Sequence, residues 1–183
     1  MRIKLTVIIF AILFLLPVCA NATINSNSKV LDGIEYYVQT DKSTYQPGEN
    51  VEMLYKITNL SEQSITLRVA NDPAWNFWAE KDGSQIWQAV NGWWEVETQF
   101  TLAPGQSYQF PDWGPSPLSP FLWNLKDSTG NIVGIGNYDI TGGLFGLDNT
   151  KVSVPIVITP EPTSLIFLAI GLPVVRTFLR RKR

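Results

Sequence analysis

The segment VEMLYKIT, residues 51–58, decides the fold class. Its positions 51, 53, 55 and 57 are apolar or aromatic, whereas positions 52, 56 and 58 are charged or polar. Side chains alternate between the two faces of a β-strand, so this spacing predicts a strand with one buried and one solvated face. An amphipathic helix would instead need apolar residues three and four positions apart.

The same alternation recurs in residues 65–69, 100–102, 108–110 and 152–158. Turn signals separate these segments, and they include Pro47-Gly48, Asp82-Gly83, Pro104-Gly105 and Thr141-Gly142-Gly143. Proline presets φ and glycine accepts positive φ, while Asp-Gly between apolar segments favours a hairpin. Residues 34–158 show no helical pattern of ten residues. We therefore predict an all-β fold, a single antiparallel Ig-like β-sandwich of seven to nine strands over residues 34–158, with residues 142–150 as a glycine-rich loop.

The N-terminus predicts a secretory signal peptide, residues 1–22. Arg2 and Lys4 precede the apolar stretch 5–16, and Ala20 and Ala22 form a small-x-small cleavage pattern. The stretch is shorter than the ~20 residues that span a bilayer. An uncleaved anchor and a lipoprotein cut before Cys19 are the alternatives. Cleavage after Ala22 leaves a mature chain without cysteine, and the polar segment 23–33 then reads as a loose leader.

The C-terminal segment, residues 159–183, has three parts in a fixed order. Pro160, Glu161 and Pro162 precede the apolar stretch 165–175, and a basic cluster closes the chain: Arg180, Arg181, Lys182 and Arg183. Basic residues remain cytoplasmic, so residues 23–160 are expected to face outward. Residues 163–175, between Pro162 and Arg176, would form a helix of 13 residues. Such a helix measures roughly 20 Å against a hydrocarbon core of ~30 Å, which suits transient rather than permanent membrane insertion.

This order of motif, short hydrophobic helix and basic tail resembles the PEP-CTERM sorting signal of Gram-negative bacteria. The resemblance implies processing by an exosortase, a membrane transpeptidase that cuts near Pro-Glu-Pro and transfers or releases its substrate. It also implies an inner-membrane intermediate, followed by the cell surface or the extracellular matrix. A plain tail anchor is the alternative.

Composition excludes several kinds of chemistry. The 183 residues include no histidine and one cysteine, so His-dependent catalysis, imidazole ligation, cysteine zinc sites and an intramolecular disulfide are impossible. Residues 23–160 hold 7 basic against 15 acidic side chains, a net charge of −8, which disfavours nucleic-acid binding. Glu95 and Glu97, expected on one strand face, could act as an acid–base pair or bind Ca²⁺, but a solvated acidic surface is favoured. Asp139 and Asp148 could hold Ca²⁺ among glycine-rich carbonyl groups. We expect no enzyme activity, no cofactor and no metal site.

The seven tryptophans offer a better indication of function. Trp87 and Trp123 occupy positions predicted to point inward. Trp93 and Trp94 are adjacent, so within a strand one of them must point outward. Trp113 lies in the proline-rich segment 111–120. We take Trp93, Trp94 and Trp113 as candidate binding aromatics for a protein or sugar partner; the alternative is that several of them pack under the loop of residues 111–121.

The domain resembles the BsuPI-type intracellular proteinase inhibitors between Tyr45 and Gly142. The resemblance rests on YQPGE at 45–49, FWAEKDG at 77–83, LAPGQ at 102–106, Trp123 and GNY at 136–138. Gln106 replaces the usual Glu, and residues 111–120 resemble an insertion. The resemblance implies a non-enzymatic binding domain whose partner is a protease. The family is intracellular, whereas the predicted signal peptide makes this domain an exported one. The alternative is an extracellular-matrix or exopolysaccharide-binding module.

Overall fold

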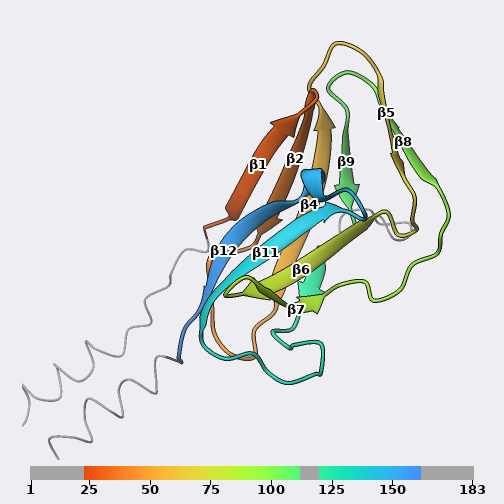
Figure 1. Cartoon of the computed structure of the whole chain (residues 1–183). Coiled ribbons are helices and arrows are strands. Elements are labelled where there is room, and N and C mark those ends of the chain that lie inside the picture. The colour runs from red at the N-terminus through yellow and green to blue at the C-terminus, as the bar shows by residue number, and fades with distance from the viewer. Residues whose placement is uncertain (1–22, 112–119, 162–183) are drawn as a thin grey trace, which may run out of the picture.

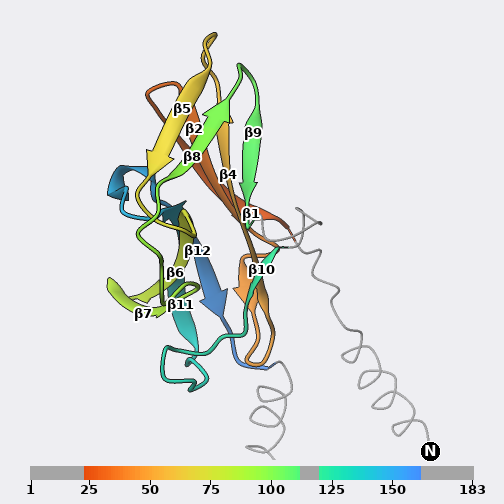
Figure 2. The ribbon, with the colours of Figure 1, turned by 90° about the vertical axis from the view of Figure 1, so that its right-hand side faces the viewer.

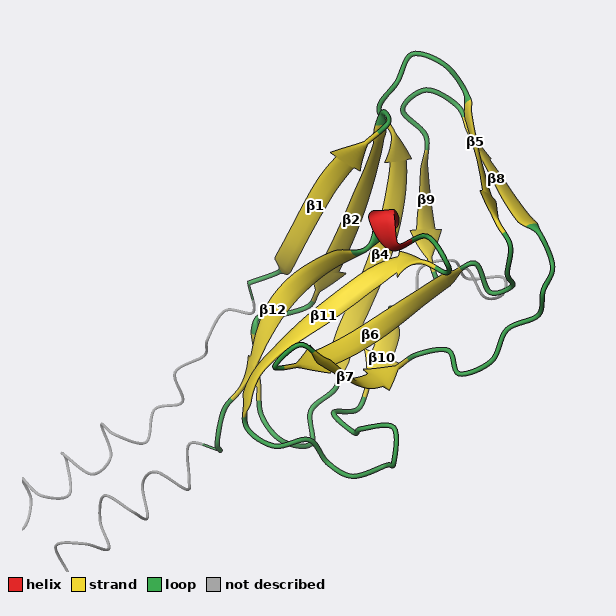
Figure 3. Ribbon diagram, viewed as in Figure 1, coloured by secondary structure: helices red, strands yellow, loops and turns green. Residues whose placement is uncertain are grey.

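The computed structural model describes residues 23–111 and 120–161, which fold into twelve strands and one short 3-10 turn (Figures 1 and 3). The prediction of an all-β, Ig-like sandwich is confirmed. The strand count exceeds the expected seven to nine, because β3 and β10 are too short to show an alternating pattern and β1 is polar.

Two five-stranded sheets form the layers of the sandwich, seen edge-on in Figure 2. The first contains β1 (Asn25–Leu31), β2 (Ile34–Thr40), β4 (Val51–Asn59), β10 (Phe121–Trp123) and β9 (Ser107–Phe110). The second contains β3 (Thr44–Tyr45), β12 (Val152–Ile158), β11 (Gly136–Leu144), β6 (Trp75–Lys81) and β7 (Ser84–Gln88). A separate ribbon pairs β5 (Ile65–Val69) with β8 (Thr98–Leu102). Neighbouring strands are antiparallel except β3 and β12, which are parallel.

Strand β4 behaves as its sequence predicts. Val51, Met53, Tyr55 and Ile57 are all fully buried, and they face the second sheet. The Tyr55 hydroxyl donates a hydrogen bond of 3.0 Å to the carbonyl oxygen of Thr150, which links the two layers. Pairing with β2 on one edge and with β9 and β10 on the other makes β4 the centre of its sheet.

Residues 23–33 are not the loose leader that their polarity suggested. Asn25–Leu31 forms β1, which joins β2 through Asp32 and Gly33 at φ values of 51° and 78°. The Asn25 and Asn27 side-chain amides donate to the carbonyl oxygens of Pro155 and Ser153 in β12, at 2.7 and 2.9 Å. The polar side chains therefore close the sandwich along this edge instead of keeping the segment in solvent.

The expected turn at Thr141-Gly142-Gly143 is also wrong, because all three residues lie inside β11 and pair with β6, and Thr141 and Gly142 pair with β12 as well. A Cβ at Gly142 would lie 2.9 Å from Cδ2 of Tyr55 and 3.1 Å from Cγ2 of Val38 in the opposite sheet. This glycine permits close packing of the two layers and does not turn the chain.

The other turn predictions are confirmed. Asp82 and Gly83 join β6 to β7 at φ values of 51° and 74°, which is the two-residue hairpin geometry that Asp-Gly favours. Gly48 and Gly105 also have positive φ, 88° and 73°. The Gln106 side-chain oxygen accepts the N–H of Ala103 at 2.9 Å, so it caps this turn.

Within residues 23–111 and 120–161, no helix is long and apolar enough to cross a membrane. The predicted signal peptide with Ala20 and Ala22, the tryptophan at 113 and the C-terminal segment from Pro162 onward, with its basic tail, lie outside the described residues.

Candidate binding surface

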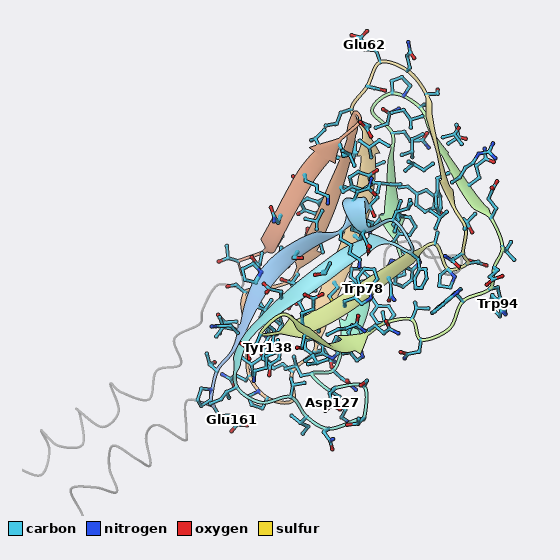
Figure 4. The ribbon with its side chains drawn as sticks, viewed as in Figure 1. Glu62, Trp78, Trp94, Asp127, Tyr138 and Glu161 are labelled. Atoms are coloured by element: carbon cyan, nitrogen blue, oxygen red, sulfur yellow. The ribbon has the colours of Figure 1, made fainter. Side chains whose placement is uncertain are left out.

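The connection between β7 and β8 carries both members of the tryptophan pair. Trp93 is 48% exposed and Trp94 is 72% exposed. The adjacency argument required only one of them to point outward. Both do so because this connection is not a regular strand, and the alternation of a strand does not apply to it. Figure 4 shows Trp94 at the outer edge of the molecule.

Trp94 is exposed, but its backbone is fixed. Its N–H donates to the carbonyl oxygen of Asp72 at 3.0 Å, and the N–H of Asp72 donates back to the carbonyl oxygen of Trp94 at 3.0 Å. The N–H of Val96 also donates to the Trp94 carbonyl oxygen, at 2.8 Å. A partner binding to this indole therefore orders little additional backbone.

Trp93 rests on a fixed base formed by Phe145. The two ring centroids are 4.6 Å apart with an interplanar angle of 43°. Phe145 follows β11, packs partly against the core, and donates its N–H to the carbonyl oxygen of Ala74 at 2.8 Å. We call Trp93, Trp94 and the 56% exposed Val96 the Trp platform.

Polar groups border the Trp platform. Arg68 Nη1 lies 3.1 Å from Glu97 Oε1, with side chains that are 64% and 57% exposed. The side-chain amide of Gln88 donates to Asn91 at 3.1 Å. Strand β8 begins at Thr98, so Glu95 and Glu97 do not share a strand face as expected. Glu97 instead forms a solvent-exposed ion pair, which suits a solvated surface better than a catalytic carboxylate pair.

The other predicted tryptophan positions belong to the interior. Trp123 is fully buried, and its indole N–H donates to the carbonyl oxygen of Lys126 at 2.7 Å. Trp87 is partly buried and stacks on Trp123 with ring centroids 5.5 Å apart. Trp75 and Trp78 are also buried. Four of the six described tryptophans thus pack inside the domain, and the other two are exposed.

The acidic residues that were considered for calcium do not converge. Asp139 lies exposed on β11, and the Asp148 side chain, 89% exposed, pairs with Lys151 Nζ at 2.8 Å. Among the residues that the structure describes, no three His, Cys, Asp or Glu side chains lie close enough to hold a metal ion.

The described part of the predicted sorting motif lies directly after the fold. Strand β12 ends at Ile158, and the N–H of Thr159 donates to the carbonyl oxygen of Tyr45 at 2.9 Å. Pro160 and Glu161 follow and are exposed. A single residue thus separates the last strand from the motif.

No family model matches the sequence, and no curated protein matches it. Similar solved structures include a β-glucosidase from Listeria innocua in complex with glucose, at 10% identity and a TM-score of 0.37, with 75% of this chain and 16% of that chain covered. The CARDB domain of PF1109 from Pyrococcus furiosus aligns at 11% identity and a TM-score of 0.35, covering 77% of this chain and 94% of that chain. A β-glucosidase from Erythrobacter marinus aligns at 10% identity and a TM-score of 0.36, covering 80% and 18%.

The chain spans about a sixth of the length of the Listeria glucosidase. Likenesses this distant carry no inference about function. The fold and the surface define the class of the molecule as an Ig-like β-sandwich domain with an exposed tryptophan surface.

Proposed function

We propose that this protein is an exported, surface-sorted binding domain without catalytic activity, and that it contacts its partner through the Trp platform. The observation that carries the proposal is the pair of neighbouring, exposed indoles held on a fixed backbone. Tryptophan supplies large apolar contact area at low entropic cost, and it is enriched at the centres of binding interfaces.

The first candidate partner is a protease. The BsuPI-type motifs between Tyr45 and Gly142 support this choice, and the rigid backbone around Trp94 suits an inhibitor that must not be remodelled by its target. The test is an inhibition assay against a panel of subtilisin-like proteases. Inhibition by the intact domain that is lost in Trp94→Ala supports the proposal.

The second candidate partner is a polysaccharide of the extracellular matrix. It is favoured by hydrogen-bonding side chains close to the Trp platform along the chain, namely Asn91, which accepts from the Gln88 amide, and Glu97, which pairs with Arg68. Sugars combine flat apolar faces with hydroxyl groups, so indoles and hydrogen-bonding side chains together suit them. The net charge of −8 over residues 23–160 favours a neutral polymer over an acidic one. A pull-down with neutral and acidic polysaccharides, run beside the protease panel, separates the two partner classes.

Both assays use the same variants. Truncating an interface anchor costs ~2 kcal/mol or more, roughly a thirtyfold loss of affinity, so Trp93→Ala and Trp94→Ala should each weaken binding. Leu122→Ala is the control, since Leu122 is 52% exposed but lies on β10 of the first sheet and not on the connection between β7 and β8. Unchanged binding by both tryptophan variants would remove the Trp platform as the site.

We further propose export through the signal peptide and processing by an exosortase at the inner membrane. We expect the mature chain to start at Thr23 and to lose its C-terminal segment near Pro160-Glu161-Pro162. N-terminal sequencing and intact mass measurement of the secreted protein provide the test. A mass that retains Arg183 in a strain with an active exosortase contradicts the sorting proposal.

A further inference from the structure

The loop between β10 and β11 carries two exposed isoleucines. Ile132 is 64% exposed and Ile135 is 55% exposed. Single exposed aliphatic residues are common on protein surfaces and need no explanation. Ile132 and Ile135 do call for an explanation, because the loop holds them in a fixed orientation and lies at a particular end of the domain.

The loop is an ordered structure that turns its apolar side chains in opposite directions. The Asp127 carboxylate accepts the N–H groups of Thr129 and Asn131, both at 2.9 Å. The N–H of Val133 donates to the carbonyl oxygen of Leu125 at 2.9 Å, and the side chains of both residues are buried. With Leu125 and Val133 fixed in the core, Ile132 is held outward.

The loop lies beside the point where the chain leaves the domain. Ile135 precedes Gly136, which pairs with Ile158, the last residue of β12. Figure 4 shows Asp127 and Glu161 at the same end of the sandwich, with Glu62 at the opposite end. The isoleucines and the exit of the C-terminal segment therefore share one end of the molecule.

Chain length keeps this end close to any membrane into which the C-terminal segment inserts. Among the residues that the structure describes, Thr159 is the last with a hydrogen bond to the fold, and the apolar stretch begins at Leu165. Six residues extend at most ~3.3–3.6 Å each, so about 20 Å separates the fold from the hydrocarbon core at full stretch. The headgroup layer occupies roughly 5–8 Å of that distance.

We propose that Ile132 and Ile135 form a membrane-contacting tip that seats in the surface of the bilayer while the C-terminal segment is inserted; the inference rests on the insertion proposed above. Aliphatic side chains partition into the interfacial region. Lys126, exposed and bridged by backbone pairing to Ile132, lies where it can meet lipid phosphates. The tip orients the domain so that the sorting motif faces the membrane-embedded processing enzyme.

The test uses the full chain in a Cys19→Ser background, so that an introduced cysteine is the only thiol. Ile132→Cys and Ile135→Cys carry an environment-sensitive fluorophore. Leu60→Cys is the matched control, because Leu60 is 55% exposed and precedes by two residues Glu62, which Figure 4 shows at the opposite end. The chain is reconstituted with vesicles of phosphatidylethanolamine and phosphatidylglycerol, and vesicle flotation is measured beside fluorescence and quenching by spin-labelled lipid. Each cysteine variant is also made with Leu168→Arg, which places a charge in the apolar stretch and blocks its insertion.

We expect a blue shift of the fluorophore emission and quenching by spin-labelled lipid at positions 132 and 135, and no change at position 60. Both signals should be lost in the chains that carry Leu168→Arg. Flotation with no response at 132 and 135 overturns the tip but leaves insertion intact. An equal response at position 60 also overturns it, because the domain then lies on its side. Signals that persist with Leu168→Arg overturn the dependence on the C-terminal segment. If the chain fails to float, the proposed insertion fails and the tip fails with it.

Discussion

Replacing Gly142 with alanine tests the packing of the two sheets directly. The added methyl group would lie 2.9 Å from Cδ2 of Tyr55, 3.1 Å from Cγ2 of Val38 and 3.2 Å from Cβ of Tyr55. Tyr55 and Val38 are both fully buried, and the Tyr55 hydroxyl is fixed by its hydrogen bond to Thr150. These neighbours cannot move aside without disturbing the core, so the two layers must separate locally.

Overpacking of this kind costs typically ~1–3 kcal/mol. At about 4 °C per kcal/mol for a domain of this size, the melting temperature of Gly142→Ala should fall by roughly 4 to 12 °C. Gly142 does not have a left-handed φ, so the loss comes from the steric contact and not from backbone strain.

Thermal and urea unfolding, followed by circular dichroism, provide the measurement. Gly134→Ala is the matched control, since a Cβ there would meet nothing within 4 Å and its φ is not positive. We expect that variant to stay within ~0.5 kcal/mol of the parent. Equal stability of the two variants would refute the close approach of β11 to β2 and β4.

Three further predictions concern the tryptophans, pH and reductant. In thermal unfolding, Trp94→Ala should change the free energy of unfolding by less than ~0.5 kcal/mol. Trp93→Ala should lower it by about 1 kcal/mol through the lost contact with Phe145, and Trp123→Ala should lower it by ~3–5 kcal/mol. If Trp93→Ala and Trp94→Ala both unfold, the Trp platform belongs to the core. Burial first, and then the hydrogen bond to Asp41, raise the pKa of Tyr45 far above its ordinary 10.0, and burial likewise raises the pKa of Tyr55. Stability that depends on these neutral tyrosines is fully present below pH ~10 and falls as the pH rises above it, so Tyr45→Phe should show a smaller alkaline loss in urea titrations. The chain from Thr23 onward contains no cysteine, so dithiothreitol should leave its melting temperature unchanged; a decrease would reveal a retained Cys19.

Alternation and turn chemistry predicted the regular strands well because both depend on neighbouring residues. In β4 and β12 the alternate apolar residues are buried, and Asp82-Gly83 forms its hairpin. Alternation did not predict strand β1, because its residues are mostly polar. The Asp32-Gly33 pair that follows it is the same hairpin signal as Asp82-Gly83, so this strand could have been predicted from the sequence.

The candidate site was predicted only in part. Adjacency alone required Trp93 or Trp94 to face solvent. The exposure of both depends on the irregular path from β7 to β8, and that path is held by pairing with Asp72, which is distant in the sequence. The sequence does not predict the contact between Trp93 and Phe145, because no local pattern connects residues so far apart.

The sequence by itself determined the all-β class, the main alternating strands, the exclusion of histidine and disulfide chemistry, and the expectation of export. These follow from composition and from periodicities that span a few residues. Only the tertiary structure decided that Gly142 lets the two sheets pack closely instead of turning the chain, that Asn25 and Asn27 close an edge, and that both indoles face outward. Each of these outcomes depends on contacts between segments distant along the chain, and the geometry of such contacts exists only once the two layers have packed.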